Sequence, residues 1–262
     1  MKVLILSVPV ILLLSLSTAK SRVAGVSAGK NATTHIDSTA SRNDTARVFA
    51  FLPGNAGRET VDLYDKLRLK MLGMSRESYV MAMEGYQQLK RMGRLHNTNV
   101  ITIIDYTLSS LHRRLFVLDI SKGRLLYNTY VAHGMGSGGE YARKFSNAPE
   151  SMQTSLGFYV TLGTYTGKHG LALRLKGVER GINDNALNRG IVLHGAPYVS
   201  ERYKAQGFMG RSEGCPAIPQ HEVTPIIKSI RNGSAVFAYY PSASYIGKSR
   251  LFDTGAGNFA KR

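Results

Sequence analysis

The chain has a single cysteine, no tryptophan and few acidic residues. Among its 262 residues only Cys215 carries a thiol, so no disulfide can form within the chain. The 17 Asp and Glu residues stand against 34 Lys and Arg residues, which gives a formal net charge of +17. The hydrophobic share of 43% is ordinary for a folded protein. These values exclude a disulfide-stapled scaffold and an acidic, disordered chain.

The chain also lacks an apolar run of the roughly 20 residues that a membrane-spanning helix needs. The run from Val3 to Leu16 is shorter; it follows Lys2 and precedes small residues that end at Ala19. This order is typical of a signal peptide. We therefore expect residues 1–19 to be a signal peptide, the protein to be exported to the periplasm or cell envelope, and no transmembrane domain beyond this segment.

The excess of positive charge favours polyanionic partners. The basic residues occur singly or in pairs such as Lys90-Arg91, and they form no recognisable nucleic-acid motif. For an exported chain we expect anionic cell-envelope polymers rather than nucleic acid as partners. The alternative is a solubilising surface that has no specific partner.

The hydrophobic pattern predicts helices first and strands afterwards. Helical spacing covers 59–72 and 75–92, with a break at Gly73. A further helix is predicted at 222–230 and a hairpin turn at 121–123. Strand patterns cover 100–106, 114–120, 125–133, 157–162, 172–175, 191–194 and 235–240.

These elements predict a mostly β (α+β) protein of several segments. The signal peptide is followed by a flexible leader at 20–57, which is rich in small and polar residues. A helical N-terminal appendage at 58–96, a catalytic domain at 97–241 and a polar tail at 242–262 complete the chain.

The lone cysteine lies in the segment Ser212-Glu213-Gly214-Cys215-Pro216-Ala217, downstream of His194, which ends an apolar run. An unpaired thiol outside the cytoplasm is open to oxidation, which favours a catalytic purpose. The thiolate is the nucleophilic form, and an imidazole or oriented N–H groups would help to ionise it. We therefore predict Cys215 as a nucleophile and His194 as its base. The alternative is that Cys215 is a small buried hydrophobe and His194 a structural histidine.

His133 and the other histidines allow further interpretations. His133 ends a predicted strand before a glycine-rich loop, so it either lines the cleft or makes a structural hydrogen bond to the backbone. Convergence of several histidines with Cys215 would make a metal site, but no pair has the close spacing of metal ligands. We expect neither a metal nor another cofactor.

Several motifs resemble one known family. His194-Gly195-Ala196 and the segment 210–217 resemble the YkuD-like murein L,D-transpeptidase catalytic domain, in the subgroup with a Gly-Cys-Pro-Ala motif. Segments 103–106, 131–134, 145–147 and 154–159 resemble it in the same order, so the resemblance covers roughly 97–241. It implies a YkuD-like β-sandwich or barrel as the catalytic domain.

The resemblance implies an exported cysteine acyl-transferase that acts on peptidoglycan stem peptides. Cys215 would attack the carbonyl of the L-centre before a terminal D-residue, with His194 as base, oriented by a backbone carbonyl near Gly195. Backbone N–H groups of Gly214 and Cys215 would form the oxyanion hole. Transfer of the acyl group to an amine makes an L,D-transpeptidase, and transfer to water makes an L,D-carboxypeptidase. A non-catalytic protein that binds envelope polymers is the alternative from another class.

The sequence departs from the broader family on both sides of the cysteine. Many members have a histidine two residues before it and an arginine two residues after it, where this chain has Glu213 and Ala217. We expect Ser212, His133 and Arg211 to take part in the substrate or oxyanion site. Arg211, Arg189 or Arg202 would neutralise a substrate carboxylate, unless these arginines are solvated surface residues.

Overall fold

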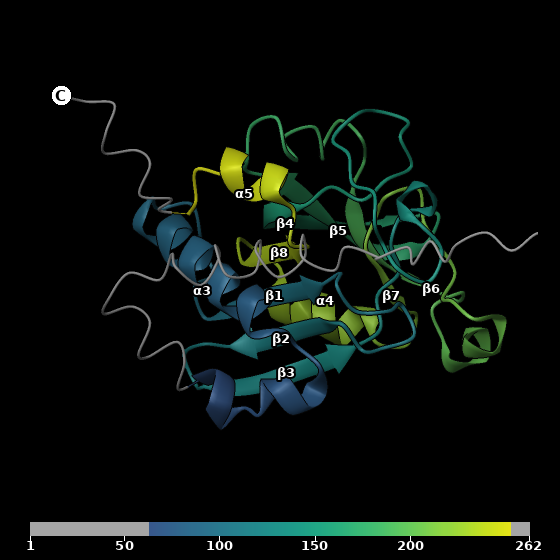
Figure 1. The fold of residues 1–262 in the computed structure, drawn as a ribbon, viewed down its shortest axis with the longest axis horizontal. Helices are drawn as coiled ribbons and strands as arrows, with labels where there is room; N and C mark the ends of the chain where they lie inside the picture. The colour runs from purple at the N-terminus through teal and green to yellow at the C-terminus, as the bar shows by residue number, and fades with distance from the viewer. Residues whose placement is uncertain (1–62, 253–262) are drawn as a thin grey trace, which may run out of the picture. The chain divides into compact units, whose positions relative to one another are not determined.

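A computed structural model describes residues 63–252 of the protein (Figure 1). The predicted signal peptide, the leader, the start of the helical segment and the end of the tail lie outside these residues. Within the described range, no helix combines the length and the apolar character required to cross a membrane.

A single eight-stranded sheet organises the fold, which is mostly β as the sequence predicted. Its strands lie in the order β3-β2-β1-β8-β4-β5-β6-β7, and the β1·β8 and β6·β7 pairs are parallel while the others are antiparallel. The strands are β1 (Val100–Asp105), β2 (Leu115–Asp119), β3 (Arg124–Thr129), β4 (Gly157–Gly167), β5 (Gly170–Gly177), β6 (Val192–Ala196), β7 (Ala217–Pro219) and β8 (Ala235–Tyr239).

Helical segments connect and cover the strands. Apart from a short helical turn at 63–66, they are the 3-10 helices η1 (Leu69–Leu72), η2 (Met135–Ser137) and η3 (Glu201–Gln206) and the α-helices α3 (Arg76–Arg91), α4 (Val223–Ile230) and α5 (Ala243–Lys248).

The helix α3 begins where the sequence provides a cap. Ser75 precedes it in extended conformation, and its Oγ accepts a hydrogen bond from the Ser78 N–H at 3.2 Å. The same hydroxyl donates to the Asp105 carboxylate at 2.8 Å, which joins the start of the helix to the end of β1. The break at Gly73 is also present, with φ at +91° before this cap.

The sheet is packed between α3 and α4. Successive residues of a strand point to opposite faces, and Phe237 of β8 belongs to the core cluster of α3 whereas Val236 belongs to that of α4. On the α3 side, Gly85 faces the ring of Phe158 so closely that a Cβ atom would collide with it. The helical segment therefore shares one core with the sheet. The boundary at residue 97 stays a prediction.

Part of the predicted polar tail also belongs to this core. Residues 243–248 form α5, and Tyr245, Leu251 and Phe252 are buried in the α3-side cluster. The buried Glu179 carboxylate accepts hydrogen bonds from the Tyr245 hydroxyl at 3.1 Å and from Ser249. The sequence pattern missed this docking because the apolar residues are few in a short polar segment, and their packing partners lie far away along the chain.

Candidate active site

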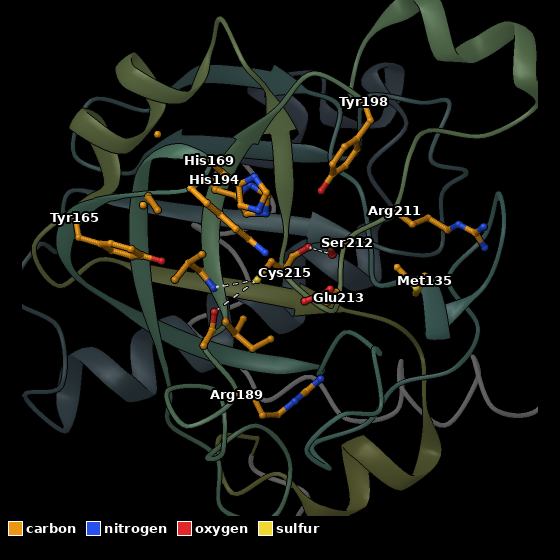
Figure 2. Close-up of a pocket in the computed structure, with 17 residues that line it drawn as sticks. Met135, Tyr165, His169, Arg189, His194, Tyr198, Arg211, Ser212, Glu213 and Cys215 are labelled. Carbon is orange, nitrogen blue, oxygen red and sulfur yellow. Dashed lines mark hydrogen bonds between the residues drawn. The ribbon is translucent and has the colours of Figure 1, made fainter.

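The lone thiol lies at the edge of the sheet, just before β7. The Cys215 Sγ accepts a hydrogen bond from the Val192 N–H at 3.4 Å and donates to the Gly190 carbonyl oxygen at 3.7 Å, as Figure 2 shows. The side chain is half-buried and lines a cavity of about 400 Å³. Cys215 is therefore accessible from a cavity and is also held by the backbone that leads into β6.

His194 occupies the neighbouring strand. It lies on β6 in register with Ala217 of β7, only 3% exposed, and it lines the same cavity as Cys215. Its Nδ1 lies 3.0 Å from the Gly195 carbonyl oxygen. Because a carbonyl can only accept, Nδ1 carries the proton and Nε2 keeps its lone pair. His194 thus has the tautomer that a general base requires, and the sequence expectation named the Gly195 region for this contact.

The two groups favour their neutral forms. Burial raises the pKa of the Cys215 thiol, although the Val192 N–H and the Arg189 charge act in the opposite direction. Burial also lowers the pKa of His194; the Gly195 carbonyl opposes this, while His169 and Lys168 lower it further. The resting pair is therefore a thiol beside a neutral imidazole rather than a thiolate beside an imidazolium.

The loop before the cysteine is fixed by the hydroxyl of Ser212. This hydroxyl donates to the Cys215 carbonyl oxygen at 2.6 Å and accepts from the Gly214 N–H at 3.1 Å. Gly214 has φ at +128°, and a Cβ there would lie 2.9 Å from the Gln153 carbonyl oxygen. Its N–H is thus engaged within the loop. Among residues 63–252 no hydrogen-bond partner is found for the Cys215 N–H, which leaves it as a donor for a ligand.

His133 faces the interior of the protein. Its Nδ1 accepts a hydrogen bond from the Arg114 guanidinium at 2.7 Å, and its Nε2 lies 3.3 Å from the Gly138 carbonyl oxygen. Burial, with help from the Arg114 charge, lowers the pKa of His133 to about 4. The residues that line the cavity of Cys215 do not include His133. Its backbone does support the site, since its carbonyl accepts from the Ser212 N–H at 3.0 Å.

The three arginines considered as carboxylate partners lie in different environments. Arg189 lines the cavity and donates to the Gln153 carbonyl oxygen at 2.6 Å and to the Ser155 hydroxyl at 2.7 Å. Arg211 also lines it, exposed, with its guanidinium 4.9 Å from the Phe208 ring. Arg202 is exposed on η3 and does not line this cavity.

Other lining residues were not anticipated from the sequence. Tyr198 points its hydroxyl toward the loop of Ser212 and Cys215, and Tyr165 approaches from the opposite side (Figure 2). His169 stacks on His194 with ring centroids 4.6 Å apart. Tyr198 follows the His194-Gly195 motif closely, which is the one signal that could have pointed to it. Tyr165 and His169 carry no local signal because the β4–β5 hairpin brings them to the site.

Metal binding has no support in the described part of the chain. Across residues 63–252 no group of three or more His, Cys, Asp or Glu side chains is arranged to hold a metal ion.

Comparison with known proteins places most of the chain in one family. Residues 70–239 match the profile of the family described as L,D-transpeptidase catalytic domain. No curated protein sequence matches the chain.

Solved structures with some similarity were also found. An L,D-transpeptidase from Mycobacterium smegmatis has a TM-score of 0.35 and 13% identity, over 54% of this chain and 59% of that chain. The LD transpeptidase LdtMt1 in complex with imipenem has a TM-score of 0.34 and 14% identity, over 54% and 59%. The helical cell shape determining protein Pgp2 from Campylobacter jejuni, a mutant, has a TM-score of 0.37 and 15% identity, over 59% and 55%. The chain thus spans less than two thirds of each of these solved chains.

Proposed function

Because this chain belongs to the family of L,D-transpeptidase catalytic domains, we propose that it is an exported cysteine acyl-transferase acting on peptidoglycan stem peptides. The observation that carries the proposal is the shared cavity of Cys215 and His194. One is the only thiol of the chain, and the other is a buried imidazole whose tautomer leaves Nε2 as an acceptor.

The reaction begins from the neutral pair. Cys215 Sγ attacks the carbonyl carbon of the L-centre while His194 Nε2 takes the thiol proton, because both resting groups are uncharged. The tetrahedral intermediate then collapses to a thioester, and the terminal D-residue leaves as an amine that takes the proton from His194. An acceptor amine or water next attacks the thioester, gives a proton to His194, and Cys215 recovers its thiol as the product leaves.

Two donors face the position of the developing oxyanion. The Cys215 N–H is one of them, since it has no partner among the described residues. The Gly214 N–H, which the family resemblance also implied, donates to Ser212 instead. We therefore assign the second donor to the Tyr198 hydroxyl, which enters the cavity from beyond β6 (Figure 2).

The charge of the cavity suits a substrate that ends in a carboxylate. Lys168, Arg189 and Arg211 line it together with a single carboxylate, that of Glu213. A terminal D-residue carries a free carboxylate, which three cations would attract. Arg189 is already hydrogen-bonded to the Gln153 carbonyl oxygen and the Ser155 hydroxyl, and Arg211 donates to the Gly138 carbonyl oxygen at 3.1 Å. We assign the exposed side chains of Lys168 and Arg211 to the substrate carboxylate.

The test is mass spectrometry of stem tetrapeptides incubated with the purified protein and with the variants Cys215→Ala and His194→Ala. We expect cysteine-dependent cross-linked dimers, with the His194→Ala variant slowed by about 10²-fold or more. Cysteine-dependent tripeptide and free D-residue without dimers would instead indicate the L,D-carboxypeptidase reaction.

A matched control is His112→Ala, which removes an exposed histidine that does not line the cavity. It should retain full turnover. No turnover by folded wild-type protein, together with binding of anionic envelope polymer, would replace the enzyme proposal with the binding-protein alternative.

A further inference from the structure

The turn of the β4–β5 hairpin brings a second histidine onto the proposed base. Gly167 pairs with Gly170 at the end of the two strands, so Lys168 and His169 form the two-residue tip. Both tip residues line the cavity of Cys215. Figure 2 shows the imidazole of His169 lying against that of His194.

The contact between the two rings is a face-to-face stack. Their centroids are 4.6 Å apart and their planes differ by 23°, so neither ring can donate a hydrogen bond to the other in this arrangement. His169 is exposed whereas His194 is 3% exposed. The outer ring thus covers a face of the inner ring that would otherwise meet solvent in the cavity.

The hairpin is built to hold this position. Gly170 has φ at +77°, a left-handed conformation that glycine adopts without strain, and it completes the turn after His169. Behind the tip, the Arg174 guanidinium of β5 lies 4.4 Å from the centre of the Tyr165 ring of β4. This cross-strand contact stiffens the hairpin near its end.

Two opposing influences act on the charge of His194. The Gly195 carbonyl favours a protonated ring, whereas burial and the charges of His169 and Lys168 disfavour it. The groups that titrate or carry charge around the same cavity are Tyr165, Lys168, His169, Arg189, Tyr198, Arg211, Glu213 and Cys215. The two residues whose charges oppose protonation of His194, Lys168 and His169, therefore both belong to the hairpin tip.

We propose that His169 is a positioning residue for His194: its stacked ring fixes the plane of the base and shields it from water. The Gly195 carbonyl holds one edge of the His194 ring, and His169 holds one face. Together they orient the free Nε2. The catalytic consequence rests on the proposed acyl transfer, but the contact and its effect on His194 do not.

The test compares wild type with His169→Ala, which removes the stack, and His169→Phe, which keeps an aromatic face without a titratable group. The full chain carries isotope-labelled histidine, and the titration of the His194 ring is followed by NMR. Removal of the ring admits water and removes a repelling charge, so His194 should titrate at higher pH in His169→Ala than in wild type. In His169→Phe, the pH at which His194 titrates should lie between the values for these two proteins.

The kinetic arm measures stem-peptide turnover and the rate at which iodoacetamide alkylates Cys215 across pH. We expect His169→Ala to lower kcat by about tenfold and to change KM little. This loss is smaller than the roughly 10²-fold loss that a 1 Å misplacement of a catalytic group can cause. His169→Phe should recover most of kcat, and His112→Ala should match wild type.

The outcomes separate this inference from the proposed function. An unchanged His194 titration in His169→Ala overturns the inference, whatever the turnover. A shifted titration in a protein that shows no turnover supports the positioning contact and contradicts the acyl-transferase proposal. A variant that is only less stable, with the wild-type titration, would reduce His169 to a structural role and would also overturn it.

Discussion

At the residue scale, the position of the proposed nucleophile, Cys215, depends on the hydroxyl of Ser212, three positions before it. Ser212 closes the loop by donating to the Cys215 carbonyl and accepting from the Gly214 N–H. It is 6% exposed, so its bonding groups have little water to replace lost partners. Ser212, which also lines the cavity of Cys215, thus fixes the conformation of the loop.

We predict that Ser212→Ala slows stem-peptide turnover by about 10- to 100-fold, because Cys215 loses its fixed position. The cost in the free energy of unfolding should be about 1–3 kcal/mol, the usual loss when a buried partner is left unsatisfied. Ser229→Ala is the matched control: this half-buried hydroxyl of α4 bonds to the Pro225 carbonyl oxygen and lies 3.5 Å from the Tyr127 hydroxyl, outside the cavity, so its loss should leave turnover unchanged. Full activity of Ser212→Ala would contradict this account.

At the element scale, α3 belongs to the core that supports the sheet. Its Gly85 allows the helix to approach β4, and Phe158 of that strand stacks on Phe237 of β8 with ring centroids 4.2 Å apart. In the sheet, only β5 separates β4, which this helix contacts, from β6 and β7, which carry His194 and follow Cys215. A displacement of α3 would therefore disturb the core between the helix and the sheet first, and the cavity of Cys215 only indirectly.

We predict that Gly85→Ala destabilises the protein by about 1–3 kcal/mol, because the added methyl group overpacks against Phe158. In an open helix position the same change normally stabilises, by about 0.5–1 kcal/mol. Gly247→Ala in α5, where nothing lies within 4 Å of the added atom, is the control with the opposite expected sign. Urea denaturation measures both, and an equal effect of the two changes would disprove the close approach.

At the scale of the whole molecule, a buried histidine beside a buried arginine makes stability depend on acid. The Arg114 guanidinium donates to the Val131 carbonyl oxygen at 2.9 Å and to His133 Nδ1 at 2.7 Å. Burial lowers the pKa of Arg114 to about 10, so it remains charged at neutral pH. Burial is the main reason that the pKa of His133 falls from 6.5 to about 4, and the nearby Arg114 charge lowers it further.

This linkage predicts a loss of global stability in acid. Between pH 6.5 and 4 the unfolded state binds a proton at His133 that the native state does not, so stability is complete above pH 6.5 and falls as the pH decreases toward 4. The loss from this group is about 3 kcal/mol, since each pKa unit corresponds to 1.36 kcal/mol. Urea denaturation across this range should show a weaker pH dependence for His133→Gln than for wild type. Equal slopes would rule out His133 as the source.

Much of the fold followed from local sequence patterns. Short runs rich in β-branched, aromatic and other apolar residues indicated seven of the eight strands, and helical spacing with end signals indicated α3 and α4. The motifs around His194 and Cys215 identified the family, which the match over residues 70–239 confirmed. The strand β7 was missed, since its three residues are too few to show a period.

The sequence by itself thus determined most of the elements, the family and the two residues proposed for chemistry, because each is encoded in nearby residues. Only the tertiary structure decided what surrounds those residues. It placed His169 on His194 through a hairpin, engaged Gly214 with Ser212, and turned His133 toward Arg114. Such contacts join residues distant along the chain or depend on the exact path of a loop. They follow from strand order and register, which local periodicity does not specify.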